Sequence, residues 1–380
     1  MRRALLAALL TTSLLAPAFA ATPPGQPEKG PGGADYPNET VVKRAVGSAS
    51  AATFVFHAAG EASKARPVII FLHSWGAANP QYYGGWIEHL ARRGNLVLFP
   101  RFQEVNRTRP ADATAMAATL VREALEALKD DKEAHPDPGR VAVVGHLAGA
   151  AIGLNLAIEA AEDGLPTPKL VFALMPGGIA SDAKSRGILL EDLGKLDPDT
   201  LLITMSGDRD HLPTDRASRR ILRETTGVPV NRKLFMRALS DSHGFPVTSA
   251  TLASPGSPMP AYDAAGIKLP PDPPRDPKDK ASRWKWTADM ALTGEQTVLT
   301  GQLGANKTDT LDYLAYWKTF DLALEAAFAG RDAASLRSDP YLVDMGNWSD
   351  GWPMKRLSAE MPKGEGEPEK AQASPRRRIN

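Results

Sequence analysis

Small residues surround Leu147 in the pentapeptide Gly145-His146-Leu147-Ala148-Gly149. The pentapeptide follows the apolar run 140–144 and precedes a segment rich in alanine and glycine, so it joins an expected strand to an expected helix. Such a junction can make a sharp turn that lifts its central side chain above the sheet, where a catalytic nucleophile can stand. Leu147 has neither a lone pair to attack a carbonyl nor a proton for a base to remove. Nucleophilic catalysis through this position is therefore excluded.

The composition excludes several other kinds of catalytic and binding site. The 380 residues include no cysteine, which excludes disulfides, thiolate metal sites and a cysteine nucleophile. Lys and Arg number 45 against 44 Asp and Glu, so there is no global positive field to hold nucleic acid. The seven histidines are scattered, and no glycine-rich stretch has the spacing of a phosphate or dinucleotide loop. We expect no metal, no cofactor and no nucleic-acid partner.

Apolar runs alternate with helical patterns through the middle of the chain. The expected strands are residues 53–57, 67–72, 95–100, 140–144, 169–175 and 200–205. The expected helices are residues 85–93, 111–132, 147–162 and 215–225. Strands that alternate with helices form βαβ units with right-handed crossovers, so the sequence predicts an α/β fold with a doubly wound, mostly parallel sheet. Ligands of such sheets bind at the carboxyl ends of the strands, where Leu147 lies.

The first twenty residues have the features of an export signal. Arg2 and Arg3 precede an apolar stretch at 5–15, and Ala18-Phe19-Ala20 fits the small-x-small rule for cleavage. The apolar stretch is well short of the ~20 residues that a spanning helix needs, so a membrane anchor is the weaker alternative. We expect cleavage after Ala20, a secreted or periplasmic protein, and no transmembrane span in the mature chain.

Three further segments are expected to lie outside regular structure. Residues 21–40 are rich in proline and glycine, which predicts a flexible N-terminal segment before a single domain at 41–361. Within that domain the proline-rich residues 255–282 can be neither helix nor central strand, so they form a loop or a lid. Residues 362–380 are charged and contain proline, which is the composition of a disordered tail.

With its strand–turn–helix pentapeptide the chain resembles the α/β-hydrolases, and in particular their secreted esterase-like members. The resemblance covers roughly residues 54–249. It includes Ile70-Phe71-Leu72-His73 before a loop of small residues, Arg93-Gly94-Asn95 before the next strand, and Gly207-Asp208-Arg209-Asp210 after a later one. The resemblance implies a single α/β-hydrolase domain, and it places the family's nucleophile, normally a serine, at Leu147.

The resemblance also assigns the other members of a catalytic triad. Asp210 stands in the position of the family's acid, with Asp208 as a competitor, and His243 stands in the position of its base. The order of nucleophile, acid and histidine along the chain is that of this fold. Each assignment has a simpler alternative, because aspartate also favours turns and helix N-caps, and a histidine in a loop can be an ordinary surface residue.

The same resemblance places an oxyanion hole beside the turn. The backbone N–H groups of Trp75 and Ala148 would be its two donors, and they do not depend on any side chain. Ser74 follows His73 where the family usually has glycine, so it is an alternative, displaced nucleophile. A loop serine without the sharp-turn geometry is more often only polar lining.

Two functions stay open from the sequence. The first is an exported α/β-hydrolase-fold protein of esterase-like ancestry, a pseudoenzyme that has lost serine-hydrolase activity at Leu147 and binds a small-molecule or ester-like ligand. The second is an active enzyme of the carboxylic ester hydrolase class, in which Asp210 and His243 activate water or a displaced serine. The sequence does not indicate the oligomeric state.

Overall fold

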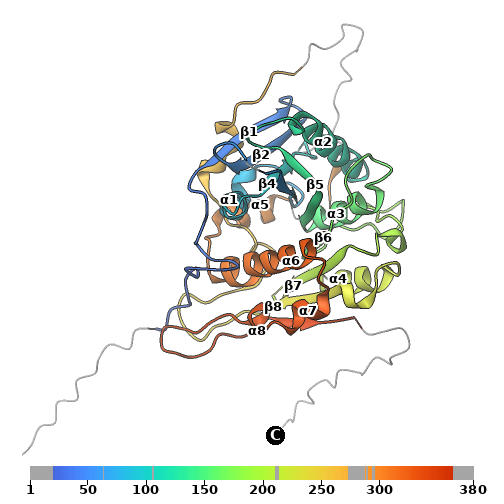
Figure 1. The fold of residues 1–380 in the computed structure, drawn as a ribbon. Coiled ribbons are helices and arrows are strands. Elements are labelled where there is room, and N and C mark those ends of the chain that lie inside the picture. Colours follow the sequence, from blue (N-terminus) through green and yellow to red (C-terminus); the bar gives the residue numbers. More distant parts are fainter. Residues whose placement is uncertain are drawn as a thin grey trace, which may run out of the picture.

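A nine-stranded sheet organises the fold in the computed structural model of the chain (Figure 1). The structure describes residues 20–62, 64–104, 107–209, 214–272, 287, 290–292 and 296–362. The strands are β1 (Val41–Gly47), β2 (Ala52–Ala58), β3 (Arg66–Leu72), β4 (Leu96–Pro100), β5 (Pro136–His146), β6 (Leu170–Leu174), β7 (Leu201–Gly207), β8 (Lys233–Ala238) and β9 (Ser358–Glu360). The helices are α1 (Gly84–Arg92), α2 (Ala113–Leu128), α3 (Ala148–Glu159), α4 (Thr214–Glu224), α5 (Gln296–Ala305), α6 (Lys318–Phe328), α7 (Ala333–Ser338) and α8 (Pro340–Val343).

The strand order is β1-β2-β4-β3-β5-β6-β7-β8-β9. From β4 to β8 all neighbouring strands in this order are parallel, whereas β1, β2 and β9 pair antiparallel at the two edges. Parallel strands need crossover connections, and here α1, α2, α3 and α4 lie along the chain between successive parallel strands. The predicted doubly wound, mostly parallel sheet is confirmed.

Strand β3 shows how the sheet is covered on both faces. Val68, Ile70 and Leu72 belong to an apolar cluster that includes residues of α2 and α3. Ile69 and Phe71, which alternate with them, belong to a second cluster with residues of α1 and α6. Because successive side chains of a strand point to opposite faces, a strand between two helical layers must be apolar at every position. This requirement explains the unbroken apolar run in the sequence.

The segment before β1 differs from the flexible stretch that its composition predicted. It forms neither helix nor strand, but its backbone is tied to elements near the other end of the chain. The Gly32 N–H donates to Oδ2 of Asp321 at 2.8 Å, and the Pro24 carbonyl accepts from the Thr310 hydroxyl at 2.6 Å. Proline and glycine prevent a regular element here, yet the carbonyl groups of both and the N–H of glycine can still bond to other elements.

Asp321 of α6 is the centre of this attachment. Its side chain is 4% exposed, and its Oδ2 lies 2.9 Å from Nε2 of His89 and 3.4 Å from Nε of Arg93. The other ring nitrogen of His89, Nδ1, lies 3.0 Å from the hydroxyl of Tyr36. One buried carboxylate thus joins α6, α1 and the N-terminal segment.

Several expected segments lie partly or wholly outside the described residues. These are the signal peptide apart from Ala20, residues 273–282 of the proline-rich stretch, and the tail from residue 363. The described part of the proline-rich stretch contains only two short 3-10 turns, Pro260–Tyr262 and Ala264–Gly266. Over the parts of the chain that the structure describes, no helix has the length and apolar character needed to cross a bilayer.

A π-helical turn, Leu311–Trp317, leads into α6 and contains the fully buried Asp312. One carboxyl oxygen of Asp312, Oδ2, accepts from the Asp309 N–H at 2.8 Å, and the other has no hydrogen-bond partner among the described residues. Burial, reinforced by the nearby Asp309 carboxylate, raises the pKa of Asp312 well above 3.8. The folded protein therefore holds this carboxyl group in its neutral form over a wider pH range than the unfolded chain does.

Asp312 should make stability depend on pH. A raised folded-state pKa contributes stability that is fully present below the unfolded pKa and is lost as the pH rises through the folded pKa. We expect Asp312→Asn, which stays neutral with nearly the same shape, to gain stability over the parent as the pH rises from about 5 to about 9. Urea unfolding of both proteins across that range measures the difference. A difference that stays constant with pH would contradict the prediction.

Candidate active site

Leu147 occupies the turn between β5 and α3 in a strained backbone conformation. Its φ is 53° and its ψ is −114°, in a region that favours glycine. The Leu147 N–H donates to the Leu174 carbonyl at 3.0 Å, and the Leu147 carbonyl accepts from the Ala150 N–H at 3.0 Å. A strained backbone residue costs of order 1–3 kcal/mol and is found most often at functional sites. The sharp turn that the pentapeptide predicted is therefore present.

Gly145 and Gly149 allow the strand and the helix to meet at this turn. A Cβ atom on Gly145 would stand 2.1 Å from the Gly149 carbonyl oxygen, and a Cβ on Gly149 would stand 2.2 Å from the Leu72 carbonyl oxygen. Rotation of a side chain cannot relieve contacts this short with backbone atoms. The small residues of the pentapeptide are required by the close approach of β5, α3 and the end of β3.

Met175 is the second non-glycine residue with a positive φ in the described part of the chain, at 48°. It directly follows β6, which pairs in parallel with β5, so Leu147 and Met175 lie at the same edge of the sheet. Both side chains are buried in one apolar cluster. Nothing in the sequence singled out Met175. The end of the sheet at which a nucleophile would stand is therefore occupied by the apolar side chains of Leu147 and Met175.

The two expected oxyanion donors lie on segments that touch. Gly149, in the first turn of α3, packs against the carbonyl groups of Leu72 and His73, just before the loop that carries Trp75. Among the described residues, no group accepts a hydrogen bond from the N–H of Trp75 or of Ala148. The N-terminus of a helix also carries a partial positive charge. This arrangement is suited to receive a carbonyl or carboxylate oxygen.

Buried polar side chains form a hydrogen-bond network with the loop after β3, the loop that carries Trp75. The Tyr83 hydroxyl donates to Oγ of Ser74 at 3.1 Å, accepts from the Ser74 N–H at 3.2 Å, and lies 2.8 Å from Nδ1 of His146. Burial raises the pKa of Tyr83 to about 12 and lowers the pKa of His146 to about 3. Ser74 is fully buried, so it is out of reach of a substrate, and its neighbour His146 is too weak a base to activate it. These contacts indicate that Ser74 holds the loop in place. They do not favour Ser74 as a displaced nucleophile.

The structure describes Asp208 but not Asp210, the two candidates for the acid of the triad. Asp210 lies outside the described residues. Asp208 accepts hydrogen bonds from the backbone N–H of Ser240, at 3.0 Å, and from the Ser240 hydroxyl. Asp208 therefore holds the start of the loop that carries His243.

His243 makes its contacts with a turn near the end of the chain. Its Nε2 lies 2.7 Å from Oδ2 of Asp350, and its ring stacks on Trp352 with centroids 5.4 Å apart and planes 13° apart. The hydrogen bond to His243 lowers the pKa of Asp350. The sequence did not single out Asp350 as a partner, since its only signal was an Asp-Gly pair typical of a turn.

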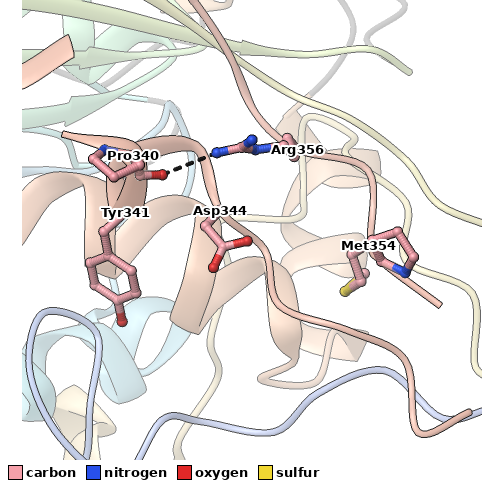
Figure 2. A pocket seen from close by; sticks show the side chains of 6 residues that line it. Pro340, Tyr341, Asp344, Met354 and Arg356 are labelled. Atoms are coloured by element: carbon pink, nitrogen blue, oxygen red, sulfur yellow. Dashed lines mark hydrogen bonds between the residues drawn. The ribbon is translucent and has the colours of Figure 1, made fainter. Parts of the chain in front are cut away.

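Two surface pockets lie away from Leu147. The first has a volume of about 430 Å³ (Figure 2). It is lined by Pro340, Tyr341, Asp344, Pro353, Met354 and Arg356, and Arg356 donates a hydrogen bond to the Pro340 carbonyl at 3.3 Å. The second, of about 520 Å³, lies between α5 and the segments around Tyr82 and Met259. Leu147, Trp75 and Ala148 line neither pocket. Within the described residues, no group of three or more His, Asp or Glu could hold a metal ion.

The strand order and the position of the strained turn together identify the type of fold. A mostly parallel sheet that carries a glycine-flanked, strained turn directly after β5, opening α3, is the arrangement of the nucleophile elbow. The fold is of the α/β-hydrolase type. The sequence model of the Chlorophyllase family matches residues 35–179 of the chain, a range that includes the elbow and β6.

Solved structures similar to this chain are distant. Carboxyl esterase 2 from the mycorrhizal fungus Tuber melanosporum is 17% identical over 54% of this chain and 79% of its own, with a TM-score of 0.41. A fungal esterase from Rhizomucor miehei is 15% identical over 60% and 81%, with a TM-score of 0.44. A putative dienelactone hydrolase from Klebsiella pneumoniae is 12% identical over 53% and 84%, with a TM-score of 0.39. No curated protein matches the chain.

Proposed function

We propose that this protein, with its α/β-hydrolase-type fold, is an exported protein of esterase-like ancestry that no longer acts as a serine hydrolase and instead binds an ester-like small molecule. The observation that carries the proposal is Leu147 at the strained elbow, with φ 53° and ψ −114°. The backbone keeps the conformation that presents a nucleophile, but the side chain cannot attack a carbonyl. The retained strain supports descent from an enzyme whose elbow residue was reactive.

The surroundings of the elbow support a neutral, ester-like ligand. The N–H groups of Trp75 and Ala148 can bind one carbonyl oxygen. They belong to the backbone, so they remain available when the nucleophilic side chain at position 147 is lost. The side chains of Leu147 and Met175 beside them are apolar. An ester carbonyl with apolar substituents satisfies both kinds of lining.

A second candidate function is residual hydrolysis by general-base activation of water. The observation in its favour is the His243–Asp350 pair at 2.7 Å, because a carboxylate that orients an imidazole is the usual form of such a base. Positioned general-base catalysis is worth roughly 10²–10⁴-fold. The contacts of His243 with Trp352 and Asp350 make this candidate weaker, since they join it to the C-terminal turn and not to the elbow.

The proposal is tested with the chain from Ala21 onward, which contains every strand of the sheet. We expect no labelling by a fluorophosphonate probe and no hydrolysis of p-nitrophenyl butyrate above buffer, together with saturable binding of that ester in calorimetry. A probe adduct mapped to any serine would overturn the loss of the nucleophile. Turnover that disappears in both His243→Ala and Asp350→Asn would establish the second candidate.

Leu147→Ser, compared with Leu147→Ala, separates loss of the nucleophile from loss of the base. Both variants remove the same buried isobutyl packing, so their difference reports the hydroxyl alone. We expect the serine variant to hydrolyse p-nitrophenyl butyrate no more than about tenfold faster than the alanine variant, because Nε2 of His243, the nitrogen that would take the serine proton, is engaged by Asp350. A gain of about a thousandfold or more would instead show that a base reaches the elbow, so only the nucleophile was lost.

A further inference from the structure

The pocket of Figure 2, which we call the α8 pocket, lies between two segments that backbone hydrogen bonds hold together. One wall is α8 with the residue after it, and the other is formed by residues 353–356. The Met354 N–H donates to the Gly346 carbonyl and the Leu357 N–H donates to the Val343 carbonyl, both at 2.9 Å. The two walls are therefore fixed relative to each other. The volume of about 430 Å³ lies within the range of roughly 300–1,000 Å³ that is usual for small-molecule sites.

Two side chains of opposite charge line the α8 pocket without pairing. Asp344 and Arg356 are both exposed, and in the described parts of the chain neither takes part in an ion pair. Figure 2 shows Arg356 reaching toward Pro340, whose carbonyl accepts its hydrogen bond at 3.3 Å. One oxygen of Asp344 accepts from the Gly346 N–H at 3.3 Å. A carboxylate can accept several hydrogen bonds and a guanidinium can donate several, so both groups retain capacity for a ligand.

A buried third charge lies behind the wall of the α8 pocket. Lys318 of α6 is fully buried, and its Nζ donates to the Asp344 carbonyl and lies 4.9 Å from the centroid of the Tyr341 ring. Burial lowers the pKa of Lys318 to about 8, so its charge is only partly compensated. The carboxylates of Asp344 and Asp339 favour this charge, and the Arg356 guanidinium opposes it. These four groups are two cations and two carboxylates, a balance that does not favour a ligand that is only an anion or only a cation.

The rest of the lining of the α8 pocket is largely apolar. It consists of Pro340, Tyr341, Pro353 and Met354. The Tyr341 hydroxyl donates to the Pro31 carbonyl at 3.3 Å, so the polar end of this side chain is occupied within the protein. Proline has no N–H to offer a ligand, and the thioether of methionine is a flexible apolar surface. A ligand of this pocket therefore needs an apolar part beside its charged groups.

We propose that the α8 pocket binds a small zwitterion, an α-amino acid with an apolar side chain. Arg356 binds the carboxylate of the ligand, since a guanidinium matches the planar geometry of that group. Asp344 accepts from the ammonium group, and the apolar part of the ligand lies against Met354 and Tyr341. A ligand with both charges pairs both side chains, whereas a ligand with one charge leaves the other side chain without a partner. Leu147 does not line this pocket, so the inference is independent of the ligand proposed for the elbow.

The test is calorimetry of the chain from Ala21 onward with three compounds of matched shape. We expect saturable binding of L-phenylalanine. Phenethylamine lacks the carboxylate and 3-phenylpropanoate lacks the ammonium group. Each should bind at least about tenfold more weakly than phenylalanine, because each loses a charge-assisted hydrogen bond.

Two variants assign each charge of the ligand to its partner. Arg356→Gln should bind phenylalanine and phenethylamine with similar affinity, because the carboxylate no longer has its guanidinium. Asp344→Asn should bind phenylalanine and 3-phenylpropanoate with similar affinity, because the ammonium group no longer has its carboxylate. The matched control is Arg337→Gln, which changes an exposed arginine of α7 outside the pocket and should bind like the parent. Because all three side chains are exposed, thermal unfolding should show that the variants fold.

Three results would overturn the proposal. The first is the absence of saturable binding of phenylalanine up to about 10 mM. The second is binding of phenethylamine or 3-phenylpropanoate to the parent as tightly as phenylalanine, or discrimination among the three compounds that is the same in the Arg356, Asp344 and Arg337 variants. The third is competition between phenylalanine and p-nitrophenyl butyrate, since this would show that the two compounds share one site. Failure of the ester to bind would contradict the function proposed for the elbow and leave the α8 pocket unaffected.

Discussion

Gly149→Ala is expected to prevent folding or to lower the free energy of unfolding by more than about 4 kcal/mol, a size reserved for severe steric or burial defects. The added Cβ would stand 2.2 Å from the Leu72 carbonyl oxygen and 2.6 Å from that of His73. To relieve the contact, α3 must move away from the end of β3. That movement would break the packing of α3 on β5 at the elbow, because Gly145 and Gly149 also meet each other closely.

Gly301→Ala is the matched control for this prediction. Gly301 lies in α5, and a Cβ there would meet no atom within 4 Å. Alanine should be neutral or stabilise the protein by about 0.5–1 kcal/mol, because glycine is unfavourable inside a helix. Urea unfolding of both variants provides the comparison. Equal stability of the Gly149 and Gly301 variants would show that the close approach at the elbow does not exist.

Asp321→Ala is expected to destabilise the protein by about 3–5 kcal/mol, the usual effect of removing one partner of a buried ion pair. His89 would keep a buried Nε2 without its acceptor, and Arg93 would lose the carboxylate 3.4 Å from its Nε. The Gly32 N–H would also lose its partner. The loss should release the N-terminal segment, so limited proteolysis should cleave between residues 21 and 40 before it cleaves elsewhere.

Glu224→Ala provides the control for a surface ion pair. Glu224 accepts from Nε of Arg220 within α4, and both side chains are about 40% exposed. Solvent screens such pairs, so the change should cost less than about 1 kcal/mol and leave the N-terminal segment protected. If the Asp321 and Glu224 variants unfold at the same urea concentration, Asp321 does not anchor the segment.

The sequence predicted those parts of the fold that burial specifies on its own. The strands β3, β4, β6 and β7 have helices on both faces, so β3, β4 and β6 contain uninterrupted apolar runs and β7 has only Thr204 within its apolar run 201–205. Strand β1 was not predicted, because it is an edge strand of intermediate burial that includes Lys43 and Arg44. Strand β8 was not predicted either, because Lys233 and Arg237 interrupt its apolar pattern.

The site was predictable to the extent that it depends on local geometry. Glycines spaced four residues apart around Leu147 predicted the turn, because only close backbone approach requires them there. The strain at Met175 and the pairing of His243 with Asp350 depend on tertiary contacts between distant segments, which leave no local pattern. The assignment of Asp210 as the acid stays a prediction, since that residue lies outside the described part of the chain.

The attachment of the N-terminal segment affects the order in which parts of the protein can fold during synthesis. Gly32 bonds to Asp321 and Thr22 to Ser349, across 289 and 327 positions of the chain. A ribosome has finished most of the polypeptide before either partner exists, so Thr22 and Gly32 can form these bonds only late in synthesis or after it. Until synthesis reaches these partners, the N-terminal segment has nowhere to dock, and docking afterwards fastens it to segments that are made late in synthesis.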